Sequence, residues 1–237
     1  MYDGITFNGK HSTRDLDLTI KEKEIGNPEK EKVLVKVPFS DFEYDFSQLY
    51  GEQEFSTREL SYTFNVYDRR THTKEQMNRL KIRALNHFME PNKMIPLYDD
   101  QIPSFHFLAE VRKEPSFKEV RGLGTLTVVF TAYKFKIYNV AEGNDEWDIF
   151  DFEYSIAQHT SLNVKGSREI MLINESFRSS IVKIVCDSEF KITLNNTTFT
   201  VSVGSTESYS FRLDKGINDL KLVGNGHIEF IWHKELI

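Results

Sequence analysis

The sequence Ile5-Thr-Phe-Asn-Gly9, followed by His11-Ser-Thr-Arg-Asp-Leu-Asp-Leu-Thr-Ile20, indicates the fold class of this chain. Its apolar residues alternate with polar ones, which is the pattern of strands that bury one face. Asn8-Gly9 stands where a tight turn would fall, because these residues tolerate a positive φ. The segment therefore predicts two paired strands at the start of the chain, with no leader peptide before them.

The composition also favours a β-rich protein. The chain has 237 residues, of which 39% are hydrophobic and 13% aromatic, with 19 Phe and 10 Tyr. Aromatic side chains suit the pleated surface of a sheet, and this length gives one large β domain or two ordinary ones. A formal net charge of −6 argues against a nucleic-acid-binding surface, which needs clustered Lys and Arg. The charge is compatible with a channel that DNA passes without binding.

We recognise no signal for export or membrane insertion in the sequence. The single cysteine, Cys186, falls on a predicted strand and is expected to be a small buried residue. No apolar run approaches the roughly 20 residues needed to cross a bilayer, and the N-terminus shows no signal-peptide pattern. We therefore expect synthesis in the cytoplasm without membrane contact, and release by a route such as cell lysis.

Residues 1–140 are predicted to form one domain of strands with a single helix. Thr73-Lys-Glu-Gln76 matches a capping box, in which two side chains satisfy free backbone N–H groups at a helix start. Apolar residues then recur at helical spacing as far as Phe88, and Pro91 stops the helix. We expect this helix, over about residues 73–90, to cover a sheet. Strands are expected at 33–37, 59–67, 97–100, 105–111 and 122–137.

A charged segment, Lys21–Lys32, follows the first predicted strands. Its residues Gly26-Asn27-Pro28 favour a loop, because they supply turn chemistry. This loop is either a solvated connection or an arm that reaches a neighbouring subunit. The candidate residues for an inter-subunit arm are Lys21, Glu22, Lys23, Glu24, Glu29, Lys30, Glu31 and Lys32.

Residues 141–160 are predicted to be a linker with a connecting strand at Phe150–Ile156, and residues 161–237 a second domain. Short strands separated by turns are typical of an antiparallel sandwich. The expected strands are 168–173, 181–186, 190–194, 198–203, 207–213, 219–223 and 227–233. The clearest turns between them are Asn195-Asn196, Asp214-Lys-Gly216 and Gly224-Asn-Gly226.

No catalytic or cofactor-binding motif is recognised. Gly122-Leu-Gly124 begins like a dinucleotide fingerprint, but it opens a strand and lacks the third glycine. The closest pair of histidines, His227 and His233, would lie about 20 Å apart along a strand, too far to chelate one ion. We therefore expect no enzyme activity, no cofactor and no metal site.

Two other functions remain as alternatives at this stage. Asp151 and Glu153 would share one face of a strand at a spacing compatible with a glycoside hydrolase, but this spacing is very common and a solvated linker face is the favoured interpretation. Trp147 and Trp232 could stack on sugar rings in a carbohydrate-binding adhesin that recognises host cell-wall sugars. The alternation of Trp232 with Ile228 favours a core position instead.

Together these patterns resemble the distal tail protein family of phages with long, non-contractile tails that infect Gram-positive bacteria. In the first half the resemblance rests on Phe7-Asn-Gly-Lys-His-Ser12, Asp15-Leu-Asp-Leu18, Val37-Pro38 with Asp41, Tyr98-Asp-Asp100, the strand 105–111, and Gly122-Leu-Gly124 leading to Val128-Val-Phe130. In the second half it rests on Gly216, Asn218-Asp-Leu220, Gly224–Phe230 and Trp232. The chain departs from the family pattern at Phe39-Ser40, where Gly-Arg is usual, and at Ala132-Tyr133, where Asp-Pro is common.

The resemblance implies a mainly β protein with one helix. Residues 1–140 would be an N-terminal β-sandwich or split-barrel-like ring domain, and residues 161–237 a C-terminal galectin-like antiparallel β-sandwich. It implies a structural virion protein at the phage tail tip that forms a homo-hexameric ring. The implied partners are the tail tube protein, the tail-associated lysin or fibre, and receptor-binding proteins that act in host adsorption. DNA would pass through the ring without specific binding.

Overall fold

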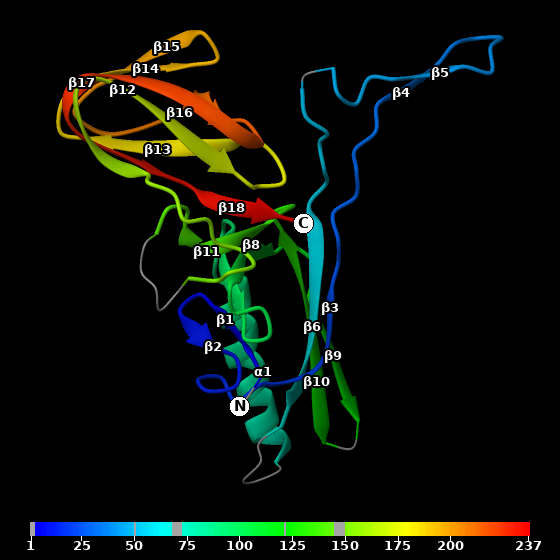
Figure 1. Ribbon diagram of the computed structural model, residues 1–237. Helices are drawn as coiled ribbons and strands as arrows, with labels where there is room; N and C mark the ends of the chain where they lie inside the picture. Colours follow the sequence, from blue (N-terminus) through cyan, green and yellow to red (C-terminus); the bar gives the residue numbers. More distant parts are fainter. Residues whose placement is uncertain (1–2, 50, 68–72, 121, 145–149) are drawn as a thin grey trace. The chain divides into compact units, whose positions relative to one another are not determined.

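The computed structural model describes residues 3–49, 51–67, 73–120, 122–144 and 150–237 (Figure 1). The chain divides into two compact units, Met1–Lys136 with Ile237, and Ile137–Leu236. Within the described residues the structure is strand-rich with a single helix, and the long strand pairs of both units are antiparallel. This architecture confirms the mainly β fold class expected from the sequence.

The first unit is built on an antiparallel sheet with the strand order β2-β1-β7-β8-β10-β6-β3, and β9 also pairs with β10. The strands are β1 (Ile5–Phe7), β2 (Lys10–His11), β3 (Thr19–Ile25), β6 (Arg58–Val66), β7 (Ile95–Asp99), β8 (Phe105–Val111), β9 (Ser116–Val120) and β10 (Leu123–Ala132). The central pair, β6 and β10, stays in register from Gly124 opposite Val66 to Ala132 opposite Arg58. Alternate residues of both strands are buried, as the sequence pattern predicted.

The opening hairpin forms, but it is shorter than predicted. Asn8-Gly9 makes the turn with φ values of 47° and 72°, the positive values that a tight hairpin turn needs. β2 ends at His11, whose ring Nδ1 accepts hydrogen bonds from the N–H groups two and three residues further on. Leu16 and Leu18 are buried without belonging to a strand. A single second strand through Ile20 is therefore wrong, because this side-chain bonding turns the backbone, and Thr19 and Ile20 belong instead to β3.

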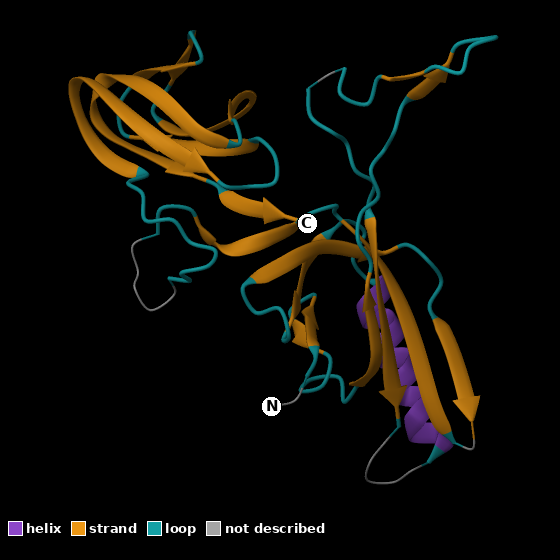
Figure 2. Cartoon of the chain, turned by 45° about the vertical axis from the view of Figure 1, so that its right-hand side comes forward, coloured by secondary structure: helices purple, strands orange, loops and turns teal. Residues whose placement is uncertain are grey.

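The helix α1 (Lys74–Met89) forms at its predicted place. It begins after Thr73, whose side-chain oxygen accepts a hydrogen bond from the Gln76 N–H at 3.3 Å. Phe88 on its inner face stacks on Phe64 of β6 at 5.4 Å between ring centroids, and meets Phe130 of β10 edge-on at 5.8 Å. The helix thus covers one face of the sheet, as expected (Figure 2). In the described part of the chain, no helix has the length and apolar character to span a membrane.

A long hairpin leaves the sheet between β3 and β6 (Figure 1). Its outer part carries β4 (Leu34–Lys36) and β5 (Glu43–Asp45), which form a two-stranded sheet with each other. The start of the predicted charged loop, Lys21–Ile25, belongs instead to β3 and pairs with β6. The loop prediction is wrong there, because charged residues are well tolerated on a strand at the edge of a sheet.

The second unit contains a sheet with the order β15-β14-β17-β13-β16, and β12 pairs with β17. Its strands are β12 (Ser161–Asn174), β13 (Ser180–Cys186), β14 (Phe190–Leu194), β15 (Thr197–Val201), β16 (Gly204–Leu213) and β17 (Gly216–Ile231), while β11 (Lys136–Ala141) pairs with β18 (His233–Leu236). Alternate residues along these strands, such as Phe190 and Phe230, form one apolar core, which also includes Trp232 between β17 and β18. Asn195-Asn196 makes the predicted turn between β14 and β15, with positive φ at both residues.

The predicted turn at Gly224-Asn-Gly226 is wrong, because β17 continues through it. β17 pairs with β12 from Asn174 opposite Gly216 to Ser161 opposite Glu229. Its other edge pairs first with β14 and, beyond these glycines, with β13. A Cβ atom at Gly224 would lie 2.5 Å from the ring of Phe190. The glycines therefore permit close packing where a continuous, curved strand changes its partner (Figure 1).

Candidate assembly surface

The long hairpin of the first unit, residues 26–57, is called the arm below. At its base the two segments of the hairpin are joined by backbone hydrogen bonds from Glu31 N to Glu54 O and from Ser56 N to Glu29 O, both 2.9 Å. Further out, β4 and β5 continue the ladder. Over much of its length the arm is therefore a ribbon of two hydrogen-bonded segments.

The outer half of the arm exposes a series of large apolar side chains. They are Val33, Leu34, Val35, Phe39, Phe42, Tyr44, Phe46 and Leu49. Successive residues of a strand point to opposite faces. Leu34 and Val35 are neighbours in β4, and both are about half exposed, at 48% and 47%. Both faces of the ribbon are therefore open. Two strands alone bury too little surface to be stable in water, and a contiguous apolar patch of this kind typically marks a protein interface.

Of the residues predicted for the arm, Lys23 belongs to an internal network of the first unit. Its Nζ lies 2.9 Å from both carboxylate oxygens of the buried Asp99. The Tyr62 hydroxyl donates a hydrogen bond to the same carboxylate at 2.9 Å. Burial, together with the charge of Asp99, raises the pKa of Tyr62. Lys21, Glu22 and Glu24 lie beside Lys23 in β3, so these four residues are outside the arm.

The other four predicted residues do lie at the base of the arm. Glu29, Lys30 and Glu31 are exposed there. Lys32 Nζ pairs with Asp45 across the hairpin at 2.8 Å, and this hydrogen bond contributes most to holding the pKa of Asp45 well below its usual range. Sequence reasoning missed the apolar members of the arm, although the alternation of aromatic residues over 42–46 was a strand signal.

The carboxylate pair considered for a hydrolase does not form. Residues 152–154 are a turn, so the predicted strand over Phe150–Ile156 is wrong. Asp151 Oδ1 accepts a hydrogen bond from Glu153 N at 2.9 Å, and the Asp151 carbonyl accepts one from Ser155 N at 2.7 Å. Aspartate commonly stabilises a turn in this way. Asp151 therefore has a structural role here, and Glu153 does not share a strand face with it.

The two tryptophans considered for sugar stacking have different outcomes. Trp232 is only 3% exposed and lies in the core of the second unit, so its ring is not available to a sugar. Trp147 lies outside the described residues. Cys186 is buried, as expected, and burial raises the pKa of its thiol.

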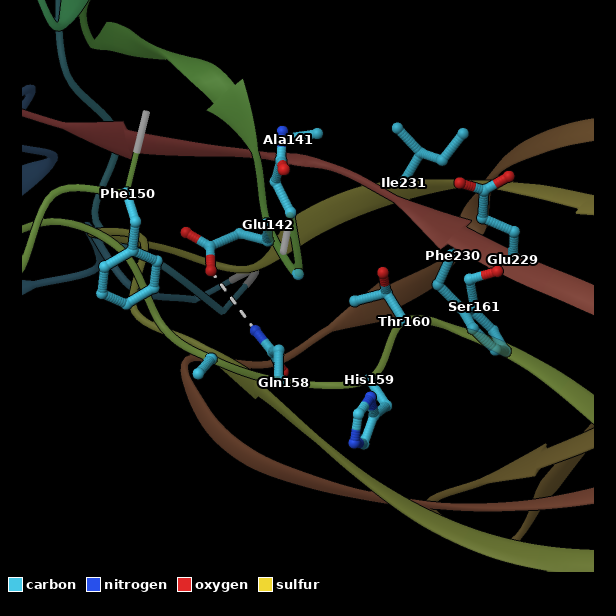
Figure 3. A pocket seen from close by; sticks show the side chains of 13 residues that line it. Ala141, Glu142, Phe150, Gln158, His159, Thr160, Ser161, Glu229, Phe230 and Ile231 are labelled. Carbon is cyan, nitrogen blue, oxygen red and sulfur yellow. Dashed lines mark hydrogen bonds between the residues drawn. The ribbon is translucent and has the colours of Figure 1, made fainter. Parts of the chain in front are cut away.

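A cavity of about 810 Å³ lies in the second unit (Figure 3). The buried carboxylate of Glu142 accepts a hydrogen bond from Gln158 Nε2 at 3.3 Å, and its other oxygen lies 3.6 Å from the buried Lys234 Nζ. Burial raises the pKa of Glu142, while Lys234 acts in the opposite direction. Lys234 lies closer to Glu175, at 2.9 Å, so its charge is balanced inside the protein, whereas Glu142 Oε1 has no hydrogen-bond partner among the described residues. No cluster of three or more His, Cys, Asp or Glu side chains suited to a metal ion occurs among the residues described.

The fold is also found in a protein of known structure. It is similar to the crystal structure of Dit (gp 19.1) from phage SPP1, which is described as a paradigm of the hub adsorption apparatus in phages that infect Gram-positive bacteria. The superposition covers 100% of each chain, with a TM-score of 0.67. The sequence identity is 12%, so the similarity establishes the fold. No protein-family model matches the chain, and no curated protein does. The fold is thus the one that the resemblance to distal tail proteins implied.

Proposed function

We propose that this chain is the ring-forming hub of a phage tail tip. In this role it joins the tail tube to the tail-associated lysin or fibre, and supports receptor-binding proteins during host adsorption. The observation that carries the proposal is the agreement with SPP1 Dit over the full length of both chains. The exposed apolar arm is an independent feature that fits an assembling subunit.

The arm suits contact with a second copy of the same chain. An arm that leaves one subunit and covers a different surface of the next makes a heterologous contact, and such contacts form a ring when the rotation closes. We propose six copies, following the family resemblance. Burial of the apolar arm residues would supply the driving force, because removing apolar surface from water is favourable. The net charge of −6 would help DNA pass the ring without binding.

The charged residues at the base of the arm would orient it. The ion pair of Lys32 and Asp45 links the two segments of the hairpin. Glu29 and Lys30 are exposed at the base of the arm. Exposed ion pairs contribute about 0–1 kcal/mol each, much less than burial of several large apolar side chains. We therefore assign the affinity of the subunit contact to the apolar outer half of the arm.

The test is negative-stain microscopy of the purified protein, with light scattering to count subunits. We expect closed six-fold rings for the unmodified chain. Replacing residues 33–51 by Asn-Gly closes the ribbon near the backbone bond between Glu31 and Glu54, so the sheet should be kept while rings are lost. A matched control, Glu29, Lys30 and Glu31 each replaced by Ser, should keep the rings. Rings that persist without residues 33–51 would refute the role of the arm, and a monomeric unmodified protein that gains no ring with its tube or hub partner would refute the function.

A further inference from the structure

The root of the arm is held against the segment Tyr133–Phe135, which follows β10 in the same unit. Among the described residues of the arm, Phe55 is the only buried one, at 7% exposed. Its ring meets the ring of Phe135, which is 1% exposed, edge-on at 5.8 Å between centroids. Phe135 in turn meets the ring of Tyr133 edge-on, also at 5.8 Å. The aromatic residue at the root is therefore fixed in the protein interior, unlike those of the outer half.

Lys134, in the middle of this segment, adds polar contacts to the same root. Its ammonium group forms an ion pair with Glu54, and its side chain is only 14% exposed. Its carbonyl oxygen accepts a hydrogen bond at 3.1 Å from Nε of Arg58, which is 2% exposed at the start of β6. The other segment of the hairpin is also tied down, because Gly26 N donates to the Glu59 carbonyl at 2.8 Å. Both segments of the hairpin are therefore attached to the rest of the unit at the root.

These root contacts decide the direction of the arm, because the arm does not fix it alone. A ribbon of two strands is marginally stable by itself, since no further layer packs on it. The backbone bonds between the two segments join them to each other, but they do not set the angle at which both leave the sheet. The contacts with Tyr133–Phe135 supply that constraint.

We propose that Tyr133–Phe135 is a clamp that sets the direction of the arm before subunits meet. This inference rests on the proposed role of the arm in ring formation. An element already held in its bound direction loses less conformational freedom on association, so it binds more tightly. Lys134 and Phe135 are positioning residues, because they act through Glu54 and Phe55 and are largely buried within their own subunit. The exposed apolar residues of the outer half make the contact itself.

The test measures the direction of the arm by pulsed electron paramagnetic resonance. Spin labels at Gln48→Cys in the arm and Asn86→Cys on α1, both exposed positions, report one distance. The background is Cys186→Ser, in which the hydroxyl can keep the hydrogen bond to the Ser202 carbonyl. Dilution into unlabelled protein restricts the signal to pairs within one subunit. We expect a narrow distance distribution when the clamp is intact.

Two substitutions remove the clamp without touching the outer half. Phe55→Ala combined with Lys134→Met should widen the distance distribution about twofold, and rings should need about tenfold more protein to form. Lys113→Met is the matched control, because it removes an exposed ion pair with Glu59 outside the clamp and should change neither result. Exchanging the charges, Lys134→Glu with Glu54→Lys, should keep the narrow distribution and the rings, whereas Lys134→Glu alone should not. Circular dichroism checks that each variant is folded.

The outcomes distinguish the clamp from the proposed function. Equal distribution widths in the clamp variant and the Lys113→Met control would overturn the clamp, and so would a broader distribution with rings at an unchanged protein concentration. A narrow distribution that the clamp substitutions broaden, in a protein that forms no rings even unmodified, would refute ring formation while upholding the clamp.

Discussion

Asp99 is the residue on which the polar interior of the first unit depends. Its carboxylate is nearly inaccessible and accepts hydrogen bonds from Lys23, Tyr62 and the backbone N–H of Gln101. Removing one partner of a buried ion pair leaves the other charge without compensation. We expect Asp99→Ala to lower the free energy of unfolding by about 3 kcal/mol, measured by urea denaturation. In a protein that already carries Lys23→Met, adding Asp99→Ala should cost far less free energy of unfolding, because no cation is then left without its partner.

An exposed ion pair provides the comparison for this prediction. Glu75 and Arg79 on α1 form an i,i+4 pair in which both side chains are largely exposed. We expect Glu75→Ala to cost well under about 1 kcal/mol, because solvent screens the pair. A cost at Asp99 no larger than the cost at Glu75 would show that the buried network does not stabilise the fold.

At the scale of elements, the curved strand β17 depends on glycine where it changes partner. A Cβ atom at Gly224 would lie 2.5 Å from the Phe190 ring and 2.9 Å from the carbonyl oxygen of Glu189. We expect Gly224→Ala to destabilise the protein by about 1–3 kcal/mol, as overpacking does. Adding Phe190→Leu should recover part of that loss, so a double-mutant cycle in urea should give a clearly favourable coupling energy.

Gly216 offers the matched control for that cycle. It has a φ of 95°, and an added Cβ would meet no atom within 4 Å. Gly216→Ala should therefore cost only backbone strain, about 1–2 kcal/mol, and its cost should add to that of Phe190→Leu without coupling. Equal coupling at Gly216 and Gly224 would contradict the steric explanation.

The same elements show what the sequence could and could not predict. Signals that depend on adjacent residues were read correctly, such as the Asn8-Gly9 turn, the Thr73 cap and the alternation that gives β8. Gly224-Asn-Gly226 has the composition of a turn, yet pairing with β12, about 60 residues earlier in the chain, keeps it in a strand. Likewise β2 ends at His11 because of ring hydrogen bonds that no periodicity reveals.

The candidate assembly surface could be predicted only in part, for the same reason. Charge identified the segment Lys21–Lys32, but pairing with β6 draws its first half into the sheet. The aromatic residues over 42–46 alternate as in a strand, and the sequence does not tell whether such a strand is covered. Only the structure shows that Phe42 and Tyr44 are exposed, and therefore that the arm presents an apolar surface.

At the scale of the whole molecule, the arm predicts how assembly responds to salt. Apolar burial is insensitive to ionic strength or strengthened by salt, whereas contacts between exposed charges are screened at about 1 M salt, where the Debye length is about 3 Å. We expect the fraction of protein in rings, measured by light scattering, to be unchanged or higher at about 1 M sodium chloride. The variant with Glu29, Lys30 and Glu31 replaced by Ser should show the same response as the unmodified chain. Rings that dissociate with salt in the unmodified chain, but not in this variant, would instead assign the subunit contact to the charged base of the arm.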